Sequence, residues 1–133
     1  MQNDDASIRP NERLLDQLSP LDDDSANLFE DNLELFCVLV KRRQQAPVLM
    51  TQPLAFESAE QIRFNKIVKA VAEREGVLLV DLEAEFRKQN NPQAFFFEDG
   101  IHFNDSGSTL AAEIIMEKLR MNIESTENMR GFK

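Results

Sequence analysis

The sequence predicts an α/β domain with parallel strands, in which helices cover both faces of the sheet in a partial three-layer α/β/α arrangement. Two short apolar segments, 48–51 and 77–80, carry this prediction, because strands buried on both faces read as continuous apolar runs. The stretch between them repeats apolar side chains at helical spacing. A strand, a helix and a second strand in this order are typical of a right-handed crossover between parallel strands.

A helix is expected before the first strand, over about 24–44. The acidic residues 22–24, followed by Ser25, supply an N-cap and the negative charge that the start of a helix favours. Pro47 cannot continue this helix. Its apolar stripe is formed by Phe29, Leu33, Phe36 and Val40 and is widened by Leu28, Leu35 and Leu39.

The second helix is expected from about Ser58 to Gly76, since glycine is the residue type that most often follows a helix C-terminus. The later elements are expected to be a short helix over 82–89, a loop over 95–104 and a last helix over 105–121. Because two strands alone make a marginal sheet, the chain is interpreted as part of an α/β domain. Its expected division is a polar N-terminal segment 1–22, the C-terminal part of the α/β domain 23–122 and a frayed tail 123–133.

The composition excludes several classes of protein. The chain has 133 residues and a formal charge of −9, which disfavours binding to a nucleic-acid backbone or to an anionic membrane surface. No stretch approaches the roughly 18 consecutive apolar residues of a membrane span. The polar, acidic start after Met1 is unlike a signal peptide, so a cytoplasmic location is expected.

The single cysteine and the single histidine limit the available chemistry. Cys37 alone cannot form an intramolecular disulfide or a thiolate metal cage, and its apolar neighbours indicate a buried small side chain. His102 is the one imidazole in the chain, and Asp99 lies three residues before it in a polar loop. This spacing lets a carboxylate orient the ring while the other ring nitrogen faces outward, as in a base for a serine hydroxyl. A purely structural interpretation is also open, in which Asn104 caps the next helix and His102 only packs.

The order of motifs from residue 33 onward resembles the C-terminal part of the SGNH hydrolases, also called GDSL-type esterases and lipases, which have a flavodoxin-like fold. The matching segments are Ala46-Pro47-Val48-Leu49-Met50-Thr51-Gln52-Pro53, Phe64-Asn65, Gly76-Val77-Leu78-Leu79-Val80-Asp81, and Asp99-Gly100-Ile101-His102-Phe103-Asn104 with Gly107. The last of these matches the final Asp-x-x-His block of the family and is the specific part.

The resemblance implies a role for each matching residue. His102 is expected to be the general base and Asp99 the residue that orients it. Asn3, in Met1-Gln2-Asn3-Asp4, matches half of the family block Gly-x-Asn-Asp and is the candidate oxyanion-hole residue. The nucleophile block Gly-Asp-Ser is absent from the sequence, so the chain is expected to lack the nucleophilic serine and to be inactive by itself.

Three classes of function remain open. In the preferred one, the chain is the C-terminal portion of an SGNH-type serine esterase and acts on an ester substrate once an upstream sequence completes it. In the second, a non-catalytic α/β module derived from this scaffold self-associates or pairs with an N-terminal segment through its strand edge. In the third, Asp99, His102 and Asp105 bind a metal, although no fourth ligand has a clear spacing. No cofactor and no metal are expected for the preferred function.

Overall fold

A computed structural model of the chain describes residues 22–131. The candidate oxyanion-hole residue Asn3 lies outside this range. The elements are, in chain order, α2 (Asp23–Arg42), β1 (Val48–Met50), α3 (Ala59–Glu75), β2 (Leu78–Val80), α4 (Leu82–Arg87), the 3₁₀ helix η1 (Pro92–Phe95) and α5 (Asp105–Arg130).

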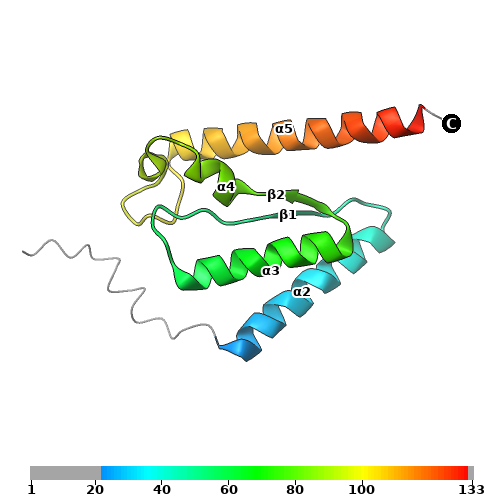
Figure 1. The fold of residues 1–133 in the computed structure, drawn as a ribbon, viewed down its shortest axis with the longest axis horizontal. Helices are drawn as coiled ribbons and strands as arrows, with labels where there is room; N and C mark the ends of the chain where they lie inside the picture. The colour runs from blue at the N-terminus through cyan, green and yellow to red at the C-terminus, as the bar shows by residue number, and fades with distance from the viewer. Residues whose placement is uncertain (1–21, 132–133) are drawn as a thin grey trace, which may run out of the picture.

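The sheet is parallel and lies between two layers of helices, as the sequence predicts. Over the described residues it has two strands, and β1 pairs with β2 in the register Val48–Leu78, Leu49–Leu79 and Met50–Val80. Helices α2 and α3 lie on one face of the sheet and α5 lies on the other (Figure 1). The crossover from β1 through α3 to β2 is therefore the strand–helix–strand unit expected from the sequence.

Local hydrogen bonds set the helix ends where the sequence places caps. The side chain of Asp22 accepts from the backbone N–H of Ser25 at 2.7 Å, and the side chain of Ser58 accepts from Gln61 N–H at 3.4 Å. Gly76 ends α3 in the left-handed conformation with φ of 60°. Glycine adopts this conformation without the steric cost that other residues incur, so the chain can turn directly into β2.

Two apolar clusters form the core, one on each side of the sheet. The first, beneath α2 and α3, contains Cys37, Leu49, Val68, Val71 and Ala72. The second, beneath α5, contains Val80, Leu82, Phe86, Phe96 and Ala111. The thiol of Cys37 is fully buried, which confirms the expectation from its neighbours, and burial raises its pKa.

Three helix ends differ from the sequence prediction, and one of them is that of α4, which ends at Arg87 rather than near Gln89. Helix α2 ends at Arg42 rather than near Gln44, and Gln44 turns the chain with φ of 57°. Helix α5 continues to Arg130, so residues 123–130, expected to fray, are helical. No Gly or Pro interrupts the sequence between 121 and 130, and Arg120 pairs with Glu124 one turn later at 3.1 Å, both of which favour a continuous helix.

The apolar surface of α2 is wider than the core that it covers. Phe29 and Leu33 pack against the first cluster, as predicted, but Phe36, predicted in the same stripe, is 45% exposed, and Leu28, Leu35 and Leu39 are exposed too. At about 100° per residue these three leucines lie roughly opposite Cys37, so they form a separate apolar line rather than widening the stripe, and they have no core beneath them in the described residues. Among residues 22–131, no helix has the length and apolar character needed to cross a membrane.

Candidate active site

Asp99 and His102 lie on one loop and are hydrogen-bonded to each other, in the geometry that their spacing predicts. The Nδ1 atom of His102 lies 2.6 Å from Oδ2 of Asp99. The His102 side chain is 77% exposed. Within residues 22–131 no hydrogen bond engages its other nitrogen, Nε2. The pair therefore presents one tethered ring nitrogen and one nitrogen that faces solvent.

The carboxylate of Asp99 is held in its ionised form by three hydrogen bonds. Besides the bond to the His102 ring, its Oδ1 accepts from the backbone N–H groups of His102 at 3.0 Å and of Ile101 at 2.9 Å. The bonds from the His102 ring, then from the two N–H groups, lower the pKa of Asp99 from 3.8 to about 2. Asp99 is thus an anion that faces Nδ1 at any pH above about 4.

The backbone of the loop is closed upon itself. The N–H of Phe97 donates to the carbonyl of His102 at 2.9 Å, and Phe96 and Phe103 form an isolated antiparallel bridge. Between them the N–H of Gly100 donates to the carbonyl of Phe97, also at 2.9 Å. Gly100 has φ of 68°, in the left-handed region that a tight turn needs and that glycine tolerates.

The capping role expected for Asn104 is confirmed, whereas His102 is exposed and does not pack as the structural interpretation expected. The side chain of Asn104 accepts from Gly107 N–H at 3.0 Å, and its amide donates to the carbonyls of Ala94 and Phe96. A side chain at Gly107 would overlap the carbonyl oxygen of Phe95. Asn104 and Gly107 therefore dock the start of α5 against η1, which fixes the end of the loop that carries His102.

The loop after β1 supports the other side of the His102 loop. The N–H of Ala55 donates to the carbonyl of Gly100 at 2.9 Å. A Cβ atom at Gly100 would lie 2.8 Å from Cε1 of Phe56, so the ring of Phe56 sits directly against this glycine. Because the segment 51–58 starts at the carboxyl end of β1, His102 is placed at the sheet edge where ligands bind in open α/β folds.

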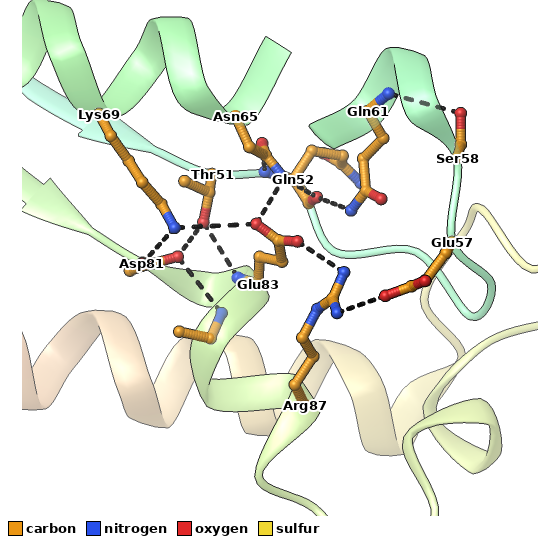
Figure 2. A network of polar contacts seen from close by, with 11 residues as sticks. Thr51, Gln52, Glu57, Ser58, Gln61, Asn65, Lys69, Asp81, Glu83 and Arg87 are labelled. Carbon is orange, nitrogen blue, oxygen red and sulfur yellow. Dashed lines mark hydrogen bonds and ion pairs between the residues drawn. The ribbon is translucent and has the colours of Figure 1, made fainter. Parts of the chain in front are cut away.

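A polar network, shown in Figure 2, joins the carboxyl ends of the two strands. The hydroxyl of Thr51 donates to Asp81 Oδ1 at 2.8 Å and accepts from Glu83 N–H at 3.0 Å. Asn65, on α3, donates to Glu83 and to the carbonyl of Gln52, and accepts from the N–H of Gln52. Thr51 and Asn65 are each 2% exposed, so these bonds are sheltered from water.

Lysine and arginine side chains balance the carboxylates of this network. Lys69 lies 2.9 Å from Asp81, and Arg87 bonds Glu83 at 2.8 Å and Glu57 at 2.7 Å. Burial opposes ionisation of Asp81, but the hydrogen bonds from Lys69, Thr51 and Ala84 outweigh it and hold the pKa of Asp81 below its ordinary value. The acids of this network are paired with bases, which indicates a clamp between β1, β2, α3 and α4 rather than a reactive group.

This clamp is not predicted from the sequence. The available signal was the polar residue after each apolar strand, Thr51 after β1 and Asp81 after β2, since such positions meet at one edge of a parallel sheet. Asn65 and Lys69 lie on α3, and their partners are distant in sequence. Spacing along the chain therefore carried no signal for them.

The remaining candidates do not gather at His102. Within the described residues no three His, Cys, Asp or Glu side chains form a group that could hold a metal, so Asp99, His102 and Asp105 do not make such a site. In the same part of the chain no serine hydroxyl is hydrogen-bonded to the imidazole. The Ser58 hydroxyl, for example, caps α3.

Comparisons with known proteins identify the relatives of this fold. Residues 3–131 match the family model described as SGNH hydrolase-like domain, acetyltransferase AlgX. The chain is similar to the crystal structure of a lipase/acylhydrolase from Enterococcus faecalis, with a TM-score of 0.65 and 19% identity, covering 73% of this chain and 52% of that one. It is also similar to LAE5, an α/β hydrolase enzyme from the metagenome of Lake Arreo in Spain, with a TM-score of 0.59 and 21% identity, covering 70% of this chain and 46% of that one. The chain spans about half the length of these solved structures. No curated protein matches it.

Proposed function

The chain belongs to the family of SGNH hydrolase-like domains described for the acetyltransferase AlgX, and on this premise we propose that it is the C-terminal portion of an SGNH-type serine esterase. His102 is the general base of the reaction and Asp99 orients it. The observation that carries the proposal is the 2.6 Å contact between Asp99 Oδ2 and His102 Nδ1, with the rest of the ring exposed.

The proposed chemistry uses the outward nitrogen of the ring. With a proton on Nδ1, Nε2 of His102 carries the lone pair and takes the proton of a serine hydroxyl as its oxygen attacks the ester carbonyl. The tetrahedral intermediate collapses, and Nε2 returns this proton to the leaving alkoxide. Water then loses a proton to Nε2 and attacks the acyl-serine, and the proton passes to the departing serine oxygen.

Asp99 serves this cycle in two ways. Its hydrogen bond to Nδ1 holds the ring in the tautomer that leaves Nε2 free to accept a proton. Its negative charge stabilises the imidazolium that forms at each transfer. The low pKa of Asp99, about 2, keeps the carboxylate charged throughout the pH range in which such a base works.

The nucleophilic serine is proposed to come from outside this chain. The sequence contains no Gly-Asp-Ser block, and Asn3 is the single candidate for an oxyanion-hole donor. A base without its nucleophile retains little activity because the residues of a triad act as a unit. The chain alone is therefore expected to hydrolyse esters no faster than a background control.

Acyl transfer to an alcohol is the second candidate, because the matching family description names an acetyltransferase. The roles of His102 and Asp99 are the same in both reactions, and only the acceptor that attacks the acyl-serine differs. In the alternative class of function, a non-catalytic module derived from the scaffold, substitution of His102 changes no reaction rate.

The test is ester hydrolysis by the chain joined to a segment that bears the nucleophile. The polypeptide encoded directly ahead of residue 1 is produced in one piece with the chain and assayed on p-nitrophenyl acetate, with and without an added alcohol acceptor. His102→Ala is expected to abolish turnover. Asp99→Asn is expected to lower it by about 10⁴-fold through the wrong tautomer. Formation of an acetylated alcohol in place of acetate identifies transfer.

Asp105→Asn is the matched control, because Asp105 is an exposed carboxylate three residues beyond His102 and begins α5. Its activity is expected to stay within about twofold of the unmodified protein, as for a surface substitution. Activity that survives His102→Ala would refute the assignment of the base. Robust turnover by the isolated chain that disappears in His102→Ala would place the nucleophile within these 133 residues and refute the fragment proposal.

A further inference from the structure

We propose that Phe97 binds the alcohol part of the ester, and that this alcohol is uncharged and carries an apolar or aromatic face. The inference rests on the proposed function for the role of His102 as the base, and it names a class of substrate for the same site. One juxtaposition carries it. Phe97 and His102 lie opposite each other on a short hairpin, and both side chains are on its outer face.

The backbone of the hairpin 95–104 fixes which side chains share a face. Phe96 and Phe103 form an antiparallel bridge, so Phe97 and His102 are the next opposite pair, and the N–H of Phe97 donates to the carbonyl of His102 at 2.9 Å. Directly opposite residues of an antiparallel pair point their side chains to the same face, with Cβ atoms about 5 Å apart. The ring of Phe97 therefore begins beside the imidazole.

Burial separates the two faces of this hairpin. On the inner face, the ring centroids of Phe96 and Phe103 lie 5.4 Å apart, and Phe96 belongs to the second core cluster. On the outer face, Phe97 is 59% exposed and the His102 side chain is 77% exposed. Ile101, in the turn directly before His102, is 37% exposed. An exposed aromatic ring thus adjoins the imidazole, with a second apolar residue next to it in the chain.

The direction of proton transfer decides which part of an ester meets this ring. Nε2 of His102 returns its proton to the leaving alkoxide, so the alcohol oxygen comes within hydrogen-bond reach of Nε2, at about 3 Å. The acyl carbon is instead bonded to the serine oxygen, which is proposed to come from outside this chain. The group attached to the alcohol oxygen is therefore the part of the substrate that lies over the His102 hairpin, within reach of Phe97.

The side chains of the hairpin indicate the chemistry of this alcohol. Aromatic rings in ligand sites contact apolar faces, and ring–ring contacts strengthen such binding. The charged groups are acids, since Glu98, Asp99 and Asp105 flank His102 in the sequence, whereas residues 89–117 contain no Lys or Arg. Because like charges repel one another, an anionic alcohol is disfavoured here. An uncharged alcohol with an apolar or aromatic group fits both features.

The experiment compares esters that differ in their alcohol alone. The protein joined to the polypeptide encoded directly ahead of residue 1 is assayed on benzyl acetate, methyl acetate and 4-(acetoxymethyl)benzoate, which share the acetyl group. Benzyl alcohol and methanol are leaving groups of similar acidity, so the ratio of their kcat/KM values reports binding of the alcohol part in the transition state. Phe97→Ala is expected to lower this ratio about 10-fold, the size of an aromatic contact, and Phe97→Leu to lower it less.

Met129→Ala is the matched control, because Met129 is an exposed apolar side chain in the last turn of α5. Its ratio is expected to stay within about twofold of the unmodified protein. If Phe97 only packs against another part of the protein, Phe97→Ala lowers kcat/KM for all three esters by one factor. That outcome, an unchanged ratio, or a preference for the carboxylated ester over benzyl acetate would overturn the inference.

A binding measurement separates this inference from the proposed function. His102 is the one histidine of the chain, so its ring-proton resonances are unique in NMR spectra of the full chain. Benzyl alcohol is expected to shift them more than methanol at the same concentration, and Phe97→Ala is expected to remove most of this difference. A joined protein that hydrolyses no ester, while the Phe97-dependent shift is present, would refute the proposed function and leave the alcohol site standing. Ester hydrolysis in which neither the shift nor the kcat/KM ratio depends on Phe97 would refute the alcohol site and leave the proposed function standing.

Discussion

The backbone N–H of Ala55 donates to the carbonyl of Gly100 at 2.9 Å, and this bond joins the loop after β1 to the loop that carries His102. The ring of Phe56 lies against the same glycine. The position of the Asp99–His102 pair relative to the sheet is therefore set by a contact between residues 45 positions apart in the sequence. Substitution of Gly100 should therefore shift the position of the Asp99–His102 pair without altering either of its side chains.

Gly100→Ala should be more costly than Gly76→Ala. Both glycines have positive φ, 68° and 60°, so an alanine incurs about 1 kcal/mol of backbone strain at either position. At Gly100 the new methyl also meets Phe56 and Ala55, whereas no atom lies within 4 Å at Gly76. Urea unfolding is expected to show a loss of about 1 kcal/mol for Gly76→Ala and about 2–4 kcal/mol for Gly100→Ala. Equal losses would show that the loop yields to the methyl group.

Thr51→Val should destabilise the clamp at the strand ends. Valine has the shape of threonine but removes the donor to Asp81 and the acceptor for Glu83 N–H. The expected loss in the free energy of unfolding is about 2 kcal/mol, because buried polar groups are left without partners. Thr109→Val is the control, since its hydroxyl bonds only the exposed carbonyl of Asp105, and a change below about 0.5 kcal/mol is expected. Similar losses for both variants would contradict the role given to Thr51.

Phe86→Ala should lower the free energy of unfolding more than Gly76→Ala or Thr51→Val does. Phe86 is 2% exposed and its ring lies within 5.0–5.8 Å of the rings of Phe95, Phe96 and Phe103. Truncation leaves a cavity beneath the His102 loop, and a loss of about 4 kcal/mol is expected in thermal or urea unfolding. Phe97→Ala removes an exposed ring of the same loop and is expected to change stability by less than about 0.5 kcal/mol. A mild effect at Phe86 would refute the tight packing of this cluster.

Asp99→Asn should cost stability in a way that depends on pH. The pKa of Asp99 is lowered from 3.8 to about 2 in the folded chain, so its ionised form stabilises the fold. This contribution is complete above pH about 4 and is lost as the pH falls through about 2. The urea midpoints of the chain and of Asp99→Asn are expected to differ at pH 5 and to converge toward pH 2. A difference that stays constant over this range would show that the ionised carboxylate contributes nothing to stability.

Features that depend on near neighbours in sequence could be predicted. The N-cap at the start of α2, the left-handed Gly76 at the end of α3 and the cap formed by Asn104 all involve partners within five residues. The contact between Asp99 and His102 is local in the same sense, since three residues separate them. The alternation of apolar strands with amphipathic helices predicted the parallel sheet and its layers, because burial on both faces requires that pattern.

Only the tertiary structure decided which side of each helix is covered and which polar groups meet across the strands. In sequence, the side of α2 that carries Leu33 and the side that carries Leu35 and Leu39 are both apolar, yet Leu33 packs in the core and the other two are exposed. In the sequence, Thr51 and Asp81 are simply the polar residues that follow two apolar strands. In the structure, the Thr51 hydroxyl donates to Asp81 Oδ1 at 2.8 Å. The physical reason is that caps and turns depend on dihedral angles and hydrogen bonds a few residues apart, whereas burial and cross-strand bonds depend on which surfaces the folded chain brings together.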